Sequence, residues 1–257
     1  DLNIKGVAYG TLFSALITSI IFLIYMFWYL SKYTKIIINF AQIFNLKKIN
    51  NIFNINLNIF IRTILLTFSF LWFTYLGTQI GEDYVAANAI LINLVFLSAF
   101  ILDAYAFSTE GIVGYSLGKK DLNLFKNIVK NSFILSSISG LIISIIFFFT
   151  YNLVINLMSD INEIRELSSS YAVWLIILPV ISSFCYQFDG IFIGASQTKE
   201  LRNAMIFSVF SYLLISILLI KFLFNTGIWI SLCIFMILRA VSLFYYLDKI
   251  YLRFRKN

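Results

Sequence analysis

Three acidic residues lie inside long apolar stretches of the sequence, where charged side chains are rare. Asp103 and Glu110 are seven residues apart, about two helical turns, so in a helix they share one face. Asp189 lies in a second apolar stretch, ten residues before Lys199. An acid at membrane depth is costly and usually faces a bundle interior or a water-filled cavity. The three carboxyl groups could therefore exchange a proton, or bind Na⁺ or a cationic substrate, as a coupled transporter requires.

A structural explanation of these acids stays open beside the functional one. Burial raises the pKa of a carboxyl group and a nearby cation lowers it, so environment decides whether such a group titrates. In the alternative, each acid only hydrogen-bonds Asn, Tyr or Arg within a helix interface. Polar and aromatic residues of the same two stretches are the expected lining of a substrate cavity: Asn88, Asn93, Tyr105, Tyr186 and Gln187.

Composition places the chain in a membrane. It is 61% hydrophobic and only 12% charged, with a mean hydropathy of +0.91, whereas a soluble domain is nearer half apolar and a quarter charged. The apolar runs are continuous and helix-length, unlike the alternating segments of a transmembrane β-barrel. We therefore expect an all-α integral membrane protein, and we attribute the net charge of +7 to loops that flank the spans rather than to nucleic-acid binding.

Several kinds of chemistry have no support in the sequence. It contains no histidine, the commonest general acid or base and metal ligand. Cys185 and Cys233 lie in apolar segments and are expected to be buried apolar residues rather than a disulfide or metal pair. No phosphate-binding Walker A loop is present, so ATP-driven transport is not encoded here. We expect neither an enzyme nor a resident metal or cofactor.

Seven spans and one linker are expected along the chain. Residues 31–56 alternate polar, basic and apolar side chains, which indicates an amphipathic interfacial linker in the cytoplasm. The domains are then 1–30, one span; 31–56, the linker; and 57–257, a six-helix unit with a basic tail. The spans are 6–30, 57–80, 84–118, 131–158, 167–196, 203–224 and 228–247.

Positive charge gathers on one side of the expected membrane. Because cytoplasmic loops carry an excess of Lys and Arg, we expect the linker and the C-terminus in the cytoplasm and the N-terminus outside. Fourteen of the nineteen basic residues fall on that side: Lys32, Lys35, Lys47, Lys48, Lys119, Lys120, Lys126, Lys130, Lys199, Arg202, Lys249, Arg253, Arg255 and Lys256.

Two arginines lie within the expected spans. Arg62 is near the start of the span 57–80 and either extends its side chain to the interface or meets an acid inside the bundle. Arg239 lies inside the last span, and the sequence leaves open which side of that helix it occupies. Pro179 frees the carbonyl of Leu175 and is expected to allow a kink.

Four stretches resemble one family. Residues 88–93 (NAILIN) and 102–114 (LDAYAFSTEGIVG) with Gly118 resemble the seventh-to-eighth helix region of multidrug and toxic compound extrusion (MATE) transporters, in the DNA-damage-inducible F-like branch. Residues 188–203 (FDGIFIGASQTKELRN) resemble the tenth helix of that branch and its following loop, and 58–63 (NIFIRT) the start of its seventh helix. The resemblance covers nearly the whole chain.

The resemblance implies a twelve-helix transporter of two six-helix lobes, of which this chain would hold the sixth helix and the C-lobe. The N-lobe would be missing, as the start at Asp1 also suggests, so this part alone should not transport. The family exports organic cations and other toxic compounds in exchange for H⁺ or Na⁺, and alternating access fits the general transporter pattern. Asp189 matches the tenth-helix acid linked to cation coupling, and Asp103 and Glu110 match eighth-helix acids. The segment 57–80 lacks the seventh-helix glutamate of Na⁺-driven members, which favours H⁺.

Two other functions are weighed against an antiporter. A lipid-linked oligosaccharide flippase of the same superfamily would prefer basic residues in a central cavity, and Arg62 and Arg239 are few for that task. A membrane-embedded enzyme would need a His or Asp-rich reactive cluster at an interface, which the sequence does not offer.

Overall fold

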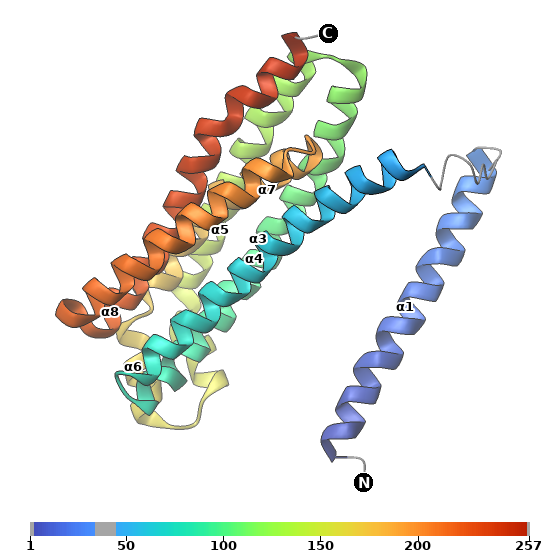
Figure 1. Cartoon of the computed structure of the whole chain (residues 1–257). Helices are drawn as coiled ribbons and strands as arrows, with labels where there is room; N and C mark the ends of the chain where they lie inside the picture. Colours follow the sequence, from blue (N-terminus) through green and yellow to red (C-terminus); the bar gives the residue numbers. More distant parts are fainter. Residues whose placement is uncertain (1–2, 34–44, 256–257) are drawn as a thin grey trace. The chain divides into compact units, whose positions relative to one another are not determined.

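The structure, a computed structural model, describes residues 3–33 and 45–255, and every regular element in these ranges is a helix (Figure 1). The chain forms two units, Asp1–Asn51 and Ile52–Asn257. The helices are α1 (Asn3–Tyr33), α3 (Leu46–Thr78), α4 (Glu82–Lys119), α5 (Leu122–Met158), α6 (Asn162–Ser170), α7 (Val173–Gly194) and α8 (Thr198–Arg255).

Helix α1 is a membrane span by composition. Its stretch Tyr9–Lys32 is long and apolar enough to cross a bilayer, and apolar side chains are exposed all around it, including Phe22 and Ile24. A helix that is apolar on every face is suited to lipid rather than to water. The expected span 6–30 is thus present, extended by a few residues at each end.

Helix α3 begins earlier than the expected span. Asn45 caps it, because the side-chain Oδ1 accepts hydrogen bonds from the backbone amides of Lys47 and Lys48 at 3.0 and 3.4 Å. Residues 46–56, predicted as part of the linker, are therefore continuous with the span that follows. The linker residues 34–44 lie outside the described residues.

In the second unit, α7 is the central helix. It packs against α4, α5 and α8 (Figure 1). In its most apolar stretch, 67% of the residues are buried inside the bundle. Two glycines bring it against α4: a Cβ on Gly190 would collide with the carbonyl of Ala106, and one on Gly194 with the carbonyl of Glu110. Small residues four apart allow such close backbone contact between membrane helices. This contact brings the helices that carry Asp103 and Asp189 together.

The predicted single span 167–196 is wrong in its first part. The structure divides it into the short helix α6 and the span α7, with a turn at Tyr171 and Ala172 between them. Arg165 holds α6 against the end of α5, since its Nε donates to the carbonyl of Ser159 at 2.5 Å. A basic side chain that binds terminal carbonyls stabilises such a helix end. Helix α7 then runs continuously through Pro179.

Helix α8 is two antiparallel helices joined at Phe224. A straight helix of 58 residues would extend for about 87 Å, nearly three times the hydrocarbon thickness of a bilayer. Phe224 instead has φ 48° and ψ −130°, and α8 reverses direction in Figure 1. The rings of Tyr212 and Phe235, one from each half, lie 5.2 Å apart between centroids. The two predicted spans 203–224 and 228–247 are both present.

The expected fold class is confirmed. Six of the described helices are long and apolar enough to cross a membrane, and the reversal in α8 gives that helix two crossings. The second unit accordingly holds six spans, contributed by α3, α4, α5, α7 and the two halves of α8.

Candidate functional site

Asp189 is the meeting point of three helices in the second unit. Its Oδ2 accepts hydrogen bonds from Nη2 of Arg62 on α3 and from Nη2 of Arg239 on α8, the latter at 2.7 Å. Asp189 is 5% exposed and Arg239 is 1% exposed. A buried charge is tolerated only when it is paired and hydrogen-bonded, so Asp189 and the two arginines compensate one another.

The two arginines differ in how firmly they are held. Arg239 is fully enclosed, with its guanidinium carbon 5.4 Å from the centroid of the Phe235 ring and its Nη1 3.5 Å from the sulfur of Met236. The Arg62 side chain keeps 15% of its surface exposed, and its buried Nε has no hydrogen-bond partner. Arg239 is a fixed counter-ion, whereas Arg62 lies at the edge of the cluster.

Asp103 joins this group from α4. Its carboxyl is half-buried and interacts electrostatically with Asp189, Arg62 and Arg239. We call Arg62, Asp103, Asp189 and Arg239 the charge cluster. With both acids ionised, two positive and two negative charges balance, which lowers the cost of holding them inside a membrane bundle.

The structure brings two of the three predicted acids together and leaves the third apart. Glu110 is also half-buried, but no ion pair joins its carboxyl to a cation among the described residues. It lies two turns along α4, where its backbone carbonyl faces Gly194. Asp103 and Asp189 therefore form one candidate site, and Glu110 is a separate carboxyl on the same helix.

Gln187, Tyr105 and Tyr186 lie on the two helices that carry the cluster's acids. The buried Gln187 accepts a hydrogen bond at Oε1 from the hydroxyl of Thr109 at 3.0 Å, while its Nε2 has no partner. The hydroxyl of Tyr105 accepts from Ser139 at 2.8 Å. Tyr186 is buried in the apolar core.

The two predicted asparagines lie elsewhere on α4. Asn88 is buried and exchanges hydrogen bonds with the amide of Asn225 at 2.6 and 3.1 Å, and its Oδ1 also accepts from the indole of Trp229 at 2.9 Å. These bonds join α4 to the second half of α8 beside its turn. Asn93 is exposed. Among the described residues, neither asparagine hydrogen-bonds a member of the charge cluster.

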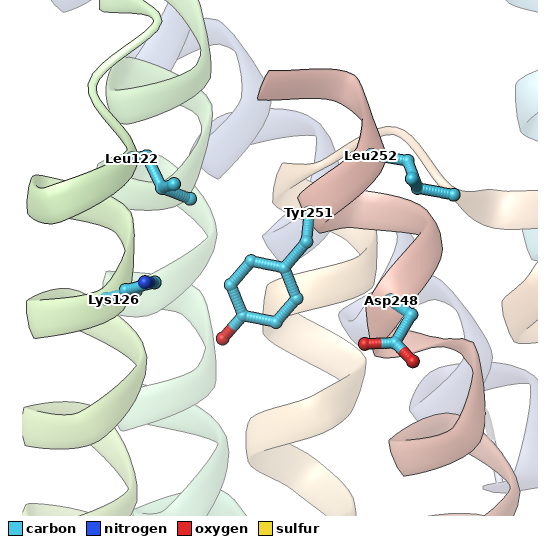
Figure 2. A pocket seen from close by; sticks show the side chains of 5 residues that line it. All are labelled: Leu122, Lys126, Asp248, Tyr251 and Leu252. Carbon is cyan, nitrogen blue, oxygen red and sulfur yellow. The ribbon is translucent and has the colours of Figure 1, made fainter. Parts of the chain in front are cut away.

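Of two open pockets in this unit, one includes a residue predicted to bind substrate. One, of about 430 Å³, lies between α4 and α5 and includes Tyr105 and Thr109 in its lining. The other, of about 550 Å³, lies between the start of α5 and the end of α8, where Figure 2 shows the ring of Tyr251 extending toward α5 between Lys126 and Asp248. None of the residues predicted to bind substrate lines the second pocket.

Arg62 and Arg239 are the functional residues that the sequence identified least well. For Arg62 two positions were open, and the structure selects the acid inside the bundle, Asp189. For Arg239 no partner could be named. The available signal was its place in an otherwise apolar span, because such a residue needs a counter-ion within the bundle.

The arrangement suits the exchange of a proton or an ion-pair partner more than bond chemistry. Among the described residues no group of His, Cys, Asp and Glu is placed to hold a metal ion. Cys185 lies one helical turn before Asp189 on α7, and it is a buried free cysteine. What remains is a buried set of paired charges with one carboxyl, Asp103, at its more open side.

Comparisons with known proteins agree with this fold. The MatE family model matches residues 59–220. The chain is 32% identical over 189 residues to the DNA damage-inducible protein F of Escherichia coli (strain K12), an alignment that covers 74% of this chain and 41% of that protein. The chain thus spans about two fifths of the length of this curated relative.

Solved structures share the fold at low identity. A crystal structure of MATE in complex with MaL6 superposes with a TM-score of 0.84 and 16% identity, covering 100% of this chain and 59% of that one. An outward-facing multidrug resistance MATE family transporter of the MOP superfamily gives a TM-score of 0.69 and 21% identity over 77% of this chain and 44% of that one. A MOP superfamily transporter from Pyrococcus furiosus gives the same four values.

Proposed function

Because this chain belongs to the MatE family, we propose that it forms the C-terminal part of a secondary antiporter that exports organic cations, drugs or toxic compounds in exchange for H⁺. Members of the family are transporters, which confirms the expectation that the chain is not an enzyme. In the proposal a preceding N-lobe of the same protein completes the transporter, and the two lobes alternate access to a site between them.

The charge cluster is the observation that carries this proposal. An acid held at membrane depth beside cations marks an ion or proton pathway more often than a structural contact. Asp103 is the member that remains half-buried while Asp189 is enclosed by two guanidinium groups. We assign proton exchange to Asp103. Asp189 serves as the counter-ion of the two arginines, and Glu110 is a second, separate proton acceptor.

The surroundings of Asp189 favour H⁺ over Na⁺. Its Oδ2 already accepts from both Arg62 and Arg239, and two adjacent positive charges oppose the entry of a metal cation. The same pairing weighs against a lipid-linked oligosaccharide flippase, because both arginines are engaged with an acid rather than free to bind pyrophosphate. An antiporter is therefore the function that the geometry supports best.

The substrate, location and orientation complete the proposal. The chain is a multi-pass membrane segment, and we place it in the cell inner (plasma) membrane with a cytoplasmic C-terminus, as the basic residues indicate. Membrane lipid and a small organic cation are its expected partners. Tyr105 and Thr109, which line the pocket between α4 and α5, are the proposed substrate-facing residues, and the buried Gln187 holds Thr109 in place.

The test uses the complete protein that contains this chain, reconstituted in vesicles with an internal pH dye. An organic cation added to the wild-type protein should drive proton movement, and Asp103→Asn should reduce that rate at least about tenfold. Asp160→Asn is the matched control, since this acid lies at the surface beside Arg165 and its variant should behave like the wild type. Equal proton movement in Asp103→Asn and the parent would remove Asp103 from the mechanism.

A further inference from the structure

We propose that Arg62 is a positioning residue that exchanges between Asp189 and Asp103, so that the protonation of Asp103 sets where Arg62 binds. The inference rests on the proposed proton exchange at Asp103 and adds a second participant to it. In the state described here Arg62 is bound to Asp189. In the other state it is bound to ionised Asp103, and Arg239 alone neutralises Asp189.

Arg62 is held by fewer contacts than Arg239, so Arg62 is the arginine that can move. Arg239 is 1% exposed and is fixed by Asp189, Phe235 and Met236. Arg62 keeps a partly exposed side chain, and among the described residues its side chain hydrogen-bonds Asp189 alone. If Arg62 leaves, the carboxylate of Asp189 still has Arg239 at 2.7 Å, so no buried charge is left unpaired.

Unused polar atoms exist for the second state. Nε of Arg62 and Oδ1 of Asp189 are buried without hydrogen-bond partners. A guanidinium has five N–H donors in a rigid fork and binds carboxylates in pairs of hydrogen bonds. Asp103 interacts electrostatically with Arg62, yet no hydrogen bond to its carboxyl is seen among the described residues. Arg62 thus has unused N–H donors, and the carboxyl of Asp103 has no hydrogen-bond donor.

Charge balance connects the exchange to the proton. When Asp103 is ionised, the cluster is neutral, and the unpaired carboxylate attracts the more mobile of the two cations. When Asp103 carries a proton, its attraction for Arg62 is lost and Arg62 returns to Asp189. Each proton taken up or released on α4 then changes the contact between α3 and α7, which is a direct mechanical consequence of a titration.

The groups around Asp103 come from three other helices. They are Arg62 on α3, Asp189, Cys185 and Tyr186 on α7, and Arg239 on α8, all in electrostatic interaction with Asp103 on α4. The nearest other carboxyl on α4, Glu110, lies two turns away. Only the carboxyl groups among them give an infrared C=O band that disappears on ionisation. The band can therefore be assigned by removing one carboxyl at a time.

The experiment is a pH titration by infrared difference spectroscopy on the complete purified protein in detergent. Asp103→Asn identifies the band of protonated Asp103 by its loss. In Arg62→Gln that band should persist to a pH at least about one unit higher than in the wild type, because ionised Asp103 has lost its partner. Arg62→Lys keeps the charge without the fork and should shift the band in the same direction by less.

The outcomes separate this inference from the proposed function. If the Asp103 band titrates but stays in place in both Arg62→Gln and Arg62→Lys, the exchange is wrong and Arg62 only neutralises Asp189. If the band that moves is lost in Asp189→Asn rather than in Asp103→Asn, the exchange is also wrong. If no titrating band is lost in Asp103→Asn, the proposed proton exchange itself fails. Should Arg62→Gln not fold, Arg62→Lys decides alone.

Discussion

Arg239 and Asp189 are separated by 50 residues in the sequence and meet at 2.7 Å between Nη2 and Oδ2 in the interior of the bundle. Asp189 lies on α7 and Arg239 on the second half of α8, so their ion pair fixes the position of the last span against the central helix. The pair is enclosed: removing Asp189 would leave the buried Arg239 without its counter-ion, and removing Arg239 would leave Asp189 only the partly exposed Arg62.

Replacing Arg239 by methionine should therefore destabilise the protein strongly. Breaking a buried ion pair can cost about 3–5 kcal/mol. Asp189 would keep Arg62 as a partner, so we expect a loss toward the lower end of that range. Thermal unfolding of the purified complete protein in detergent would measure this loss. The matched control is Asp160→Asn, which removes the surface pair with Arg165 but keeps the hydrogen bonds from Arg165 to the carbonyls of Ser159 and Asn156. It should cost about 1 kcal/mol or less. Equal losses for the two variants would contradict the ion pair's structural role.

The contact between α4 and α7 predicts a second difference, between two glycines. Alanine at Gly190 would place its methyl group against the carbonyl of Ala106, whereas the same change at Gly111 meets nothing within 4 Å. Overpacking of this kind costs about 1–3 kcal/mol, so Gly190→Ala should lower the unfolding temperature and Gly111→Ala should leave it unchanged or raise it slightly. Because the clash moves α4 from α7, Gly190→Ala should also weaken proton coupling.

Asn88 offers a third prediction, which separates structure from substrate binding. Asn88→Ala leaves the amide of Asn225 and the indole of Trp229 without their partner, and each unsatisfied buried group costs about 1–3 kcal/mol. We expect reduced stability with an unchanged ranking of transported cations. Asn93→Ala is the control, since Asn93 is exposed. A changed ranking in a stable Asn88→Ala protein would instead support the sequence-based assignment of Asn88 to the substrate cavity.

The sequence allowed the spans and the acids to be predicted, because both are properties of single segments. An apolar run of about twenty residues identifies a span, and an acid inside it is conspicuous. Pairing was harder. Which cation meets Asp189 depends on how three helices rotate against one another, and no local pattern encodes that rotation. For this reason the sequence left Arg62 two positions, at the membrane interface or beside an acid inside the bundle.

Local breaks were predicted unevenly. The expected spans 203–224 and 228–247 leave residues 225–227 for the turn in α8, and the non-helical backbone lies just before them, at Phe224. The break between α6 and α7 was missed, because the serines before Tyr171 are compatible with a helix and only their contacts with the end of α5 decide the outcome, as in the hydrogen bond from Ser169 to Asn152 at 3.2 Å. Tertiary contacts override weak helix propensity at such positions.

Membrane orientation supplies the last prediction. If the basic loops are cytoplasmic, Lys120 faces the cytoplasm and Thr226, beside the turn in α8, faces outward. In intact cells a membrane-impermeant maleimide should label Thr226→Cys but label Lys120→Cys only after the cells are opened. The native Cys185 and Cys233 are buried, so the wild-type protein should give little background. The reverse pattern, with Lys120→Cys labelled from outside, would invert the topology and place the basic residues on the wrong side for the proposed direction of export.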